Sequence, residues 1–183
     1  MLIAEKKKKY TVDDYLLLEE GAPFQLIEND LVMSPSPLPL HQIISIKMST
    51  WISNFLNQTN NKGVAMYAPM DVYFDEGNVF QPDLLFIAEE NLEIIKSRVE
   101  GAPDMVIEIL SPSNAYYDLR LKKGIYEKFG VKEYIIVDPI EQSAEVHSIE
   151  NGVYVLKQKA QKSDTLHSVI LPGLSFDLAK IFA

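Results

Sequence analysis

The stretch from Met105 to Val137 reads MVIEILSPSNAYYDLRLKKGIYEKFGVKEYIIV and decides the fold. Its two ends, Met105–Leu110 and Tyr134–Val137, are short runs of β-branched and aromatic residues, which are typical of buried strands. Between them, Tyr116–Phe129 carries apolar residues in steps of four, which predict a helix ended by Gly130. The order strand, helix, strand predicts a right-handed crossover between two parallel strands.

The rest of the chain predicts antiparallel strands and one long helix around this unit. Residues 41–57 repeat apolar side chains at helical spacing, so we expect an amphipathic helix with one buried face. Local patterns predict several further elements: a helix at 14–20 with a Thr11/Asp14 capping box, a hairpin of 24–28 and 30–33 around Asn29, strands at 64–74, 79–88, 144–149 and 153–156, and a short terminal helix after Pro172-Gly173. The chain shows no internal repeat or linker. Residues 1–183 therefore fit a single α/β (α+β) domain with a mixed central β-sheet flanked by helices.

Composition excludes several classes of protein. Seventeen Lys and Arg against 26 Asp and Glu give a net charge of −9, which argues against a protein that coats nucleic acid by charge alone. The absence of cysteine excludes a disulfide framework, a thiol nucleophile and zinc sites built on sulfur, and it favours a reducing, cytoplasmic location. The N-terminus lacks the pattern of a signal peptide, and no apolar run approaches the roughly 18 residues needed to span a bilayer.

Two acidic residues interrupt apolar strands. Asp83 opens the run Leu84–Ile87, and Glu108 lies inside another run, on the same face as Val106. A buried carboxylate costs several kcal/mol unless it is paired, protonated or bound to a cation. Asp83 can also be a turn or cap residue, and Glu108 can pair with a buried Arg or Lys. Together they can hold a hard divalent ion such as Mg²⁺, which makes phosphodiester hydrolysis a candidate reaction.

A basic segment follows the Glu108 strand. Residues 111–132 carry five basic side chains against two acidic ones, a balance of +3, although a solvated helix face also explains such charges. Lys122 differs from the others because it adjoins Leu121 at the edge of the apolar stripe. From there its stem can extend across the core toward the sheet. Its amine can then orient an attacking water or stabilise phosphate charge.

An ordered set of motifs resembles a known family. The motifs are the leader Phe24-Gln-Leu-Ile-Glu-Asn-Asp-Leu-Val-Met-Ser-Pro followed by His41, then Pro82-Asp83, Gly101-Ala-Pro-Asp-Met-Val-Ile-Glu108-Ile-Leu-Ser-Pro-Ser113, Asp118-x3-Lys122-x3-Tyr126-x3-Gly130-Val-x-Glu133-Tyr and Ile136-Val-Asp-Pro139. Over about residues 10–180 they resemble the Uma-two family of restriction endonuclease-like proteins. That family is grouped with the PD-(D/E)xK nucleases, whose fold is a mixed sheet flanked by helices and whose metal is usually Mg²⁺ or Mn²⁺.

The resemblance implies a set of site residues. Asp83 and Glu108 would be metal ligands, with the Ile109 backbone carbonyl as a third. The standard motif has a lysine two residues after the glutamate, where this chain has Leu110. The resemblance implies that Lys122, on the following helix, takes its place.

Two further positions of the family's pattern bear on the site. Gln25 stands where the family usually has a glutamate, so the amide would weaken the site if that glutamate binds metal or positions water. His41 also occupies a family position. A histidine at the start of a helix can equally be a cap or a surface residue.

Three functional hypotheses follow. The leading one is a metal-dependent DNA endonuclease with Mg²⁺ or Mn²⁺, acting as a homodimer because double-strand cleavage needs two active sites. The second is a catalytically weak or inactive nuclease-fold module that binds nucleic acid or a protein partner, which Gln25 and the charge of −9 favour. The third is a metal-free hydrolase with two carboxylates, but no aromatic cluster in the sequence argues for its sugar cleft.

Overall fold

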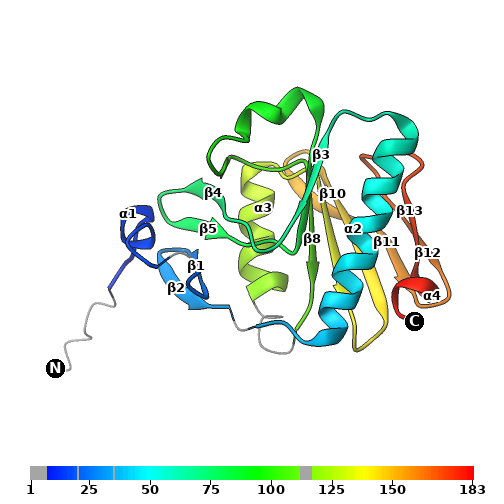
Figure 1. The fold of residues 1–183 in the computed structure, drawn as a ribbon, viewed down its shortest axis with the longest axis horizontal. Coiled ribbons are helices and arrows are strands. Elements are labelled where there is room, and N and C mark those ends of the chain that lie inside the picture. Colours follow the sequence, from blue (N-terminus) through cyan, green and yellow to red (C-terminus); the bar gives the residue numbers. More distant parts are fainter. Residues whose placement is uncertain (1–7, 20, 35, 112–116) are drawn as a thin grey trace.

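A six-stranded mixed sheet forms the centre of the computed structural model, which describes residues 8–19, 21–34, 36–111 and 117–183 (Figure 1). Its strand order is β11-β10-β9-β8-β6-β3. The bounds are β3 (Val64–Tyr67), β6 (Leu84–Ile87), β8 (Met105–Ile109), β9 (Glu133–Asp138), β10 (Ser143–Glu150) and β11 (Val153–Gln161). Only β8 and β9 pair in parallel in this sheet, which confirms the predicted parallel strands and the mixed α+β fold.

Two smaller sheets and several helices complete the fold. A five-stranded sheet has the order β2-β1-β5-β4-β7, with β1 (Phe24–Ile27), β2 (Asp30–Met33), β4 (Val72–Asp75), β5 (Asn78–Phe80) and β7 (Val99–Glu100). A hairpin pairs β12 (Thr165–His167) with β13 (Ser175–Asp177). The helices are α1 (Val12–Tyr15), α2 (Pro39–Thr59), the 3-10 helix η1 (Glu89–Ile94), the π-helix η2 (Tyr117–Lys122), α3 (Lys123–Phe129) and α4 (Leu178–Ile181). No helix in the described part of the chain is long and apolar enough to cross a membrane.

Helices cover both faces of the central sheet. The buried face of α2 packs against alternate residues of β6 and β8, including Leu84 and Ile107. The opposite face, with Leu85 and Val106, packs against α3 and the five-stranded sheet. Because side chains alternate along a strand, each central strand contributes to both apolar layers. These layers fix the positions of α2 and α3 relative to the ends of β6 and β8.

Several predicted elements are confirmed. The long helix spans residues 39–59 rather than 41–57, and Gly130, with a φ of 79°, ends α3. The hairpin turns at Glu28 and Asn29, which both have positive φ. The strands at 144–149 and 153–156 form β10 and β11, and α4 is the terminal helix. The predicted start of the crossover helix at Tyr116 lies outside the described residues.

Three predicted boundaries are wrong. The run 64–74 divides into β3 and β4, and the run 79–88 divides into β5 and β6, so each run serves two sheets. Pro69 and Pro82 lie at the two divisions, where a residue without an N–H cannot continue a ladder. The first helix has its capping box but spans only Val12–Tyr15, with Tyr15 as its one buried side chain.

Candidate active site

Asp83 lies at the start of β6, where the chain enters the central sheet. Leu84 pairs with Ile107 in the antiparallel register, so Asp83 stands level with Glu108 on β8. Its Oδ2 accepts a hydrogen bond from the Ile109 N–H at 2.7 Å and lies 3.1 Å from His41 Nε2. The side chain therefore caps the end of β8, as the interpretation as a cap residue expects, and is held there by α2.

Glu108 lies on β8 and faces α3 from the same side of the sheet as Val106. Its Oε1 accepts hydrogen bonds from Lys122 Nζ at 3.0 Å and from Tyr126 Oη at 2.6 Å. The Glu108 and Lys122 side chains are each only 3% exposed. The expected cost of a buried carboxylate is thus offset by a buried cation and a phenol. Lys122 is both the buried pairing partner and the lysine that the motif pattern indicates.

The helix that follows β8 positions Lys122 and Tyr126. They are four residues apart, so they project from one helix face toward the sheet. The Tyr126 ring packs 5.6 Å from both Phe74 and Phe80, centroid to centroid. Its packing leaves the hydroxyl fixed at Glu108. Tyr126 belongs to the Asp118-x3-Lys122-x3-Tyr126 motif, and its spacing of four residues from Lys122 is the sequence signal for this contact.

Gln25 reaches the site through the backbone beside Asp83. Its Oε1 accepts a hydrogen bond from the Gln81 N–H at 2.8 Å, and its Nε2 lies 3.2 Å from Ser34 Oγ. An amide oxygen can accept this bond as a carboxylate would. Gln25 therefore supports the Gln81-Pro82-Asp83 turn. No local pattern in the sequence connects Gln25 with Gln81.

His41 lies in the first turn of α2 and is buried. The N-cap of α2 is Leu38, and no side chain makes a cap hydrogen bond there. The interpretations of His41 as a cap or a surface residue are therefore wrong. Its Nε2 instead lies beside the Asp83 carboxylate, so the structure brings His41 to the predicted site.

Two carboxylates at this end of β8 are the groups that a hard cation would take. Asp83 and Glu108 supply carboxylate oxygens from neighbouring strands, and Mg²⁺ commonly takes one or two carboxylates together with waters. Within the described ranges, no group of three or more His, Cys, Asp or Glu side chains is arranged to hold a metal. Ile109 meets Asp83 through its N–H, so the role of its carbonyl stays a prediction.

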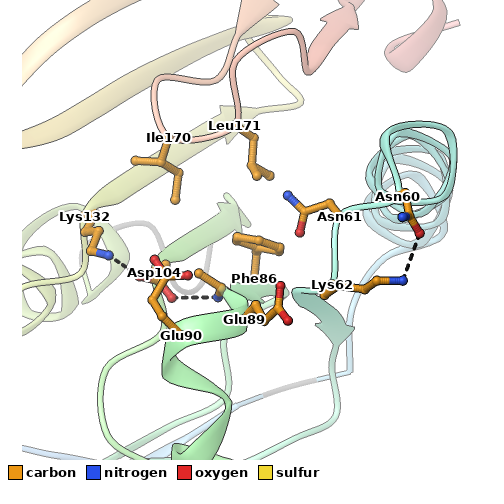
Figure 2. A pocket seen from close by; sticks show the side chains of 11 residues that line it. Asn60, Asn61, Lys62, Phe86, Glu89, Glu90, Asp104, Lys132, Ile170 and Leu171 are labelled. Atoms are coloured by element: carbon orange, nitrogen blue, oxygen red, sulfur yellow. Dashed lines mark hydrogen bonds and ion pairs between the residues drawn. The ribbon is translucent and has the colours of Figure 1, made fainter.

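A pocket of about 310 Å³ lies at the opposite end of β6 (Figure 2). It is lined by Phe86, Asp104 and Lys132 among others, and by none of the predicted site residues. Asp104 Oδ2 caps β6 by accepting from the Ala88 N–H at 2.7 Å, as Asp83 caps β8. Burial alone would raise the Asp104 pKa, but its hydrogen bonds, first from Lys132, outweigh burial and lower it. Both Pro-Asp pairs, 82–83 and 103–104, therefore cap a neighbouring strand, so a Pro-Asp pair alone does not mark a functional site. The buried ion pair of Glu108 with Lys122 is what distinguishes the candidate site.

The mixed sheet sets Asp83, just before β6, level with Glu108 on β8, and a buried lysine contacts Glu108, as the motif resemblance leads us to expect. The chain belongs to the Uma2 family, described as "putative restriction endonuclease", whose model matches residues 12–179. The resemblance expected from the sequence motifs is thereby confirmed.

A solved structure supports the same fold. It is described as a "putative nuclease belonging to DUF820" from Anabaena variabilis. The TM-score is 0.77 at 19% identity, and the match covers 94% of this chain and 97% of that one. No curated protein matches the chain. Family and fold together support a nuclease-like function.

Proposed function

We propose that the protein is a metal-dependent endonuclease that hydrolyses phosphodiester bonds in DNA. The observation that carries the proposal is that Asp83, just before β6, stands level with Glu108 on β8, with the Lys122 amine 3.0 Å from Glu108. Asp83 and Glu108 would hold Mg²⁺ or Mn²⁺, with the Ile109 carbonyl as a third ligand. A divalent ion there supplies Lewis-acid polarisation of a phosphoryl oxygen.

The chain's own groups orient these ligands and handle charge. His41 and the Ile109 N–H fix Asp83, and Tyr126 with Lys122 fixes Glu108 through one oxygen. The Lys122 amine is buried, so its charge acts in a medium of low dielectric constant. It orients the attacking water or offsets the negative charge that develops on the phosphate.

The substrate and the assembly belong to the same proposal. The Uma2 family description names restriction endonucleases, which supports DNA as the partner. Cleavage of both strands requires two active sites, which a homodimer supplies. The absence of cysteine fits a reducing compartment such as the cytoplasm.

Plasmid cleavage tests the proposal. The wild type is expected to nick and linearise supercoiled plasmid with Mg²⁺ or Mn²⁺ but not with EDTA. Asp83→Asn, Glu108→Gln and Lys122→Met should each lose at least about tenfold in rate, since each group acts on the reacting centre. Cleavage that persists in all three variants would come from a contaminant and would overturn the assignment.

Asp104→Asn is the matched control, because Asp104 also caps a strand but lies at the far end of β6. It should keep its cleavage activity. Removing one partner of a buried ion pair costs about 3–5 kcal/mol of stability. The melting temperature of Lys122→Met should therefore be measured together with its activity. The double variant Glu108→Gln/Lys122→Met should recover part of the lost stability.

A non-catalytic nuclease-fold module is the second candidate function. It is favoured by the net charge of −9 and by Glu108, whose Oε1 already has two partners within the protein. Gln25 supports it less than the sequence suggested, because its amide oxygen binds backbone rather than facing a ligand site. Calorimetry with Mn²⁺ separates the two candidates, since a module would bind no metal at millimolar concentration.

A further inference from the structure

The outer face of α2 is apolar in its N-terminal half, and the whole helix is nearly uncharged. Among its 21 residues, Lys47 is the only Lys, Arg, Asp or Glu. Its Nζ lies 2.8 Å from the backbone oxygens of both Lys180 and Ala183, so this charge is held against the end of α4. Leu40, Ile43 and Ile46 are nevertheless 44%, 45% and 66% exposed. We call these three residues the α2 face.

The α2 face lies opposite the side of the helix that packs on the sheet. That buried side carries Ile44, Met48 and Ile52. A helix in contact with water normally shows charged residues on its outer side. The groove beside Ile46, of about 300 Å³, extends the apolar surface to Thr50 and Trp51 and is also lined by Lys47 and Lys180. Contiguous exposed apolar surface of this kind marks interaction sites, and the cores of protein interfaces are depleted of charge.

We propose that the α2 face is the contact between two copies of this chain. In a two-fold contact the same residues of both copies face one another. With a net charge of −9 per chain, two copies repel wherever acidic residues would meet. The α2 face carries none. The two lysines of the adjoining groove are held within the chain, Lys47 by backbone oxygens of α4 and Lys180 by Asp177, so two copies can approach at Leu40, Ile43 and Ile46 without acidic side chains meeting.

Other partners fit this face less well. DNA requires several basic side chains, but only two lysines adjoin this face: the Lys47 amine is bonded to backbone oxygens and Lys180 is paired with Asp177. Helices that lie on membranes are rich in Lys and Arg on the polar side, which α2 is not. A second exposed apolar group, Val153 and Val155 on β11, adjoins Lys157 and Lys159, and lysines on an edge strand oppose pairing.

Pairing through α2 would connect the two active sites. His41, in the first turn of the same helix, contacts Asp83. Ridge-and-groove packing of two such helices would cross near Ile43, since this places all three residues of the α2 face in the contact. The dimer is part of the proposed function and this inference rests on it, yet the surface can be tested without any cleavage.

Solution mass measures the contact directly. Light scattering on the full chain should give twice the chain mass, and Ile43→Asp/Ile46→Asp should give about half of the wild-type mass, because burying a charge in the contact is costly. Ile140→Asp, at a position 73% exposed on another surface, should stay dimeric. A monomeric wild type, or a dimer that survives Ile43→Asp/Ile46→Asp, would overturn the proposal.

Disulfide trapping gives a second measurement that does not depend on weakening the fold. The chain has no cysteine, so Ile43→Cys would carry the only thiol. Close to a two-fold axis the two thiols can join, since a disulfide needs Cα atoms about 4.4–6.8 Å apart. Oxidation should yield a covalent dimer with Ile43→Cys or Ile46→Cys and monomer with Leu17→Cys, which is 85% exposed elsewhere. Equal trapping by all three variants would overturn the proposal.

The cleavage assay keeps this inference separate from the proposed function. Ile43→Asp/Ile46→Asp should still nick plasmid but should linearise it far more slowly. A dimer that this double variant dissociates, in a protein without nuclease activity, would refute the nuclease and keep the surface. A monomeric wild type whose cleavage depends on Lys122 would refute the contact surface and keep the nuclease.

Discussion

At the scale of single residues, Glu108 shows how the fold prepares a ligand. Lys122 and Tyr126 both donate hydrogen bonds to the same oxygen of its carboxylate, Oε1. The donors therefore fix the direction of the whole carboxylate group. Groups that hold a metal ligand in place commonly matter about 10–100-fold for metal affinity. Tyr126 is thus a positioning residue for the proposed site.

Tyr126→Phe tests this role because it removes the hydroxyl and keeps the packed ring. We expect about tenfold weaker Mn²⁺ binding by calorimetry, with little change in the far-UV circular dichroism that reports secondary structure. The control is Tyr154→Phe, whose hydroxyl donates to the Val131 carbonyl at 2.8 Å, away from Glu108. Wild-type affinity in Tyr126→Phe would show that Lys122 alone orients Glu108. Absence of binding in the wild type would instead count against the metal site.

At the scale of elements, the spacing of apolar residues predicted the helices and strands that bury one regular face. Spacing along the chain located α2 and the parallel pair β8 and β9, because each buries a regular face. The division of 64–74 and 79–88 between two sheets was missed, since both halves of each run are equally apolar. The contact of Gln25 with Gln81 was missed as well, because it joins segments 56 residues apart. Asp83 and Glu108 stand out in the sequence, because a carboxylate beside or within an apolar strand is unusual wherever it lies, and their role as metal ligands stays a prediction.

Glu133, at the start of β9, anchors the loop between β12 and β13 to the central sheet. Its Oε2 accepts hydrogen bonds from the N–H groups of Val169 and Ile170. Burial raises the pKa of this carboxyl above its ordinary value of 4.5, and the two backbone hydrogen bonds only partly offset that. Between pH 4.5 and the raised pKa, the folded state keeps a proton that the unfolded chain has released. Stability should therefore fall as pH rises through this window and level off above it.

Glu133→Gln should lose this dependence, so its stability relative to the wild type should improve as pH rises above 4.5. Urea unfolding at a series of pH values measures the difference. The exposed Glu141→Gln serves as the control and should follow the wild-type curve. Parallel curves for the wild type and Glu133→Gln would show that the Glu133 carboxyl ionises alike in both states.

At the scale of the whole molecule, charge limits how the protein can engage DNA. The net charge of −9 opposes binding, while residues 111–132, which follow β8, carry a balance of +3. A divalent ion at Asp83 and Glu108 would neutralise two of the acidic groups nearest a bound phosphate. The two effects together favour weak binding that depends on metal and on a few phosphate contacts.

DNA binding in Ca²⁺, measured by fluorescence anisotropy against salt concentration, tests this balance. The wild type should bind with Ca²⁺ and lose binding in EDTA, with a shallow slope because few phosphates are neutralised. Arg120→Ala and Lys123→Ala, beside Lys122, should each weaken binding on every sequence and reduce the slope by about one. Lys62→Ala, at the pocket on the far end of β6, should change neither quantity. Equal binding with and without metal would mean that the acidic site does not face the DNA. The same salt-dependence slope in all three variants would place the DNA contact elsewhere on the molecule.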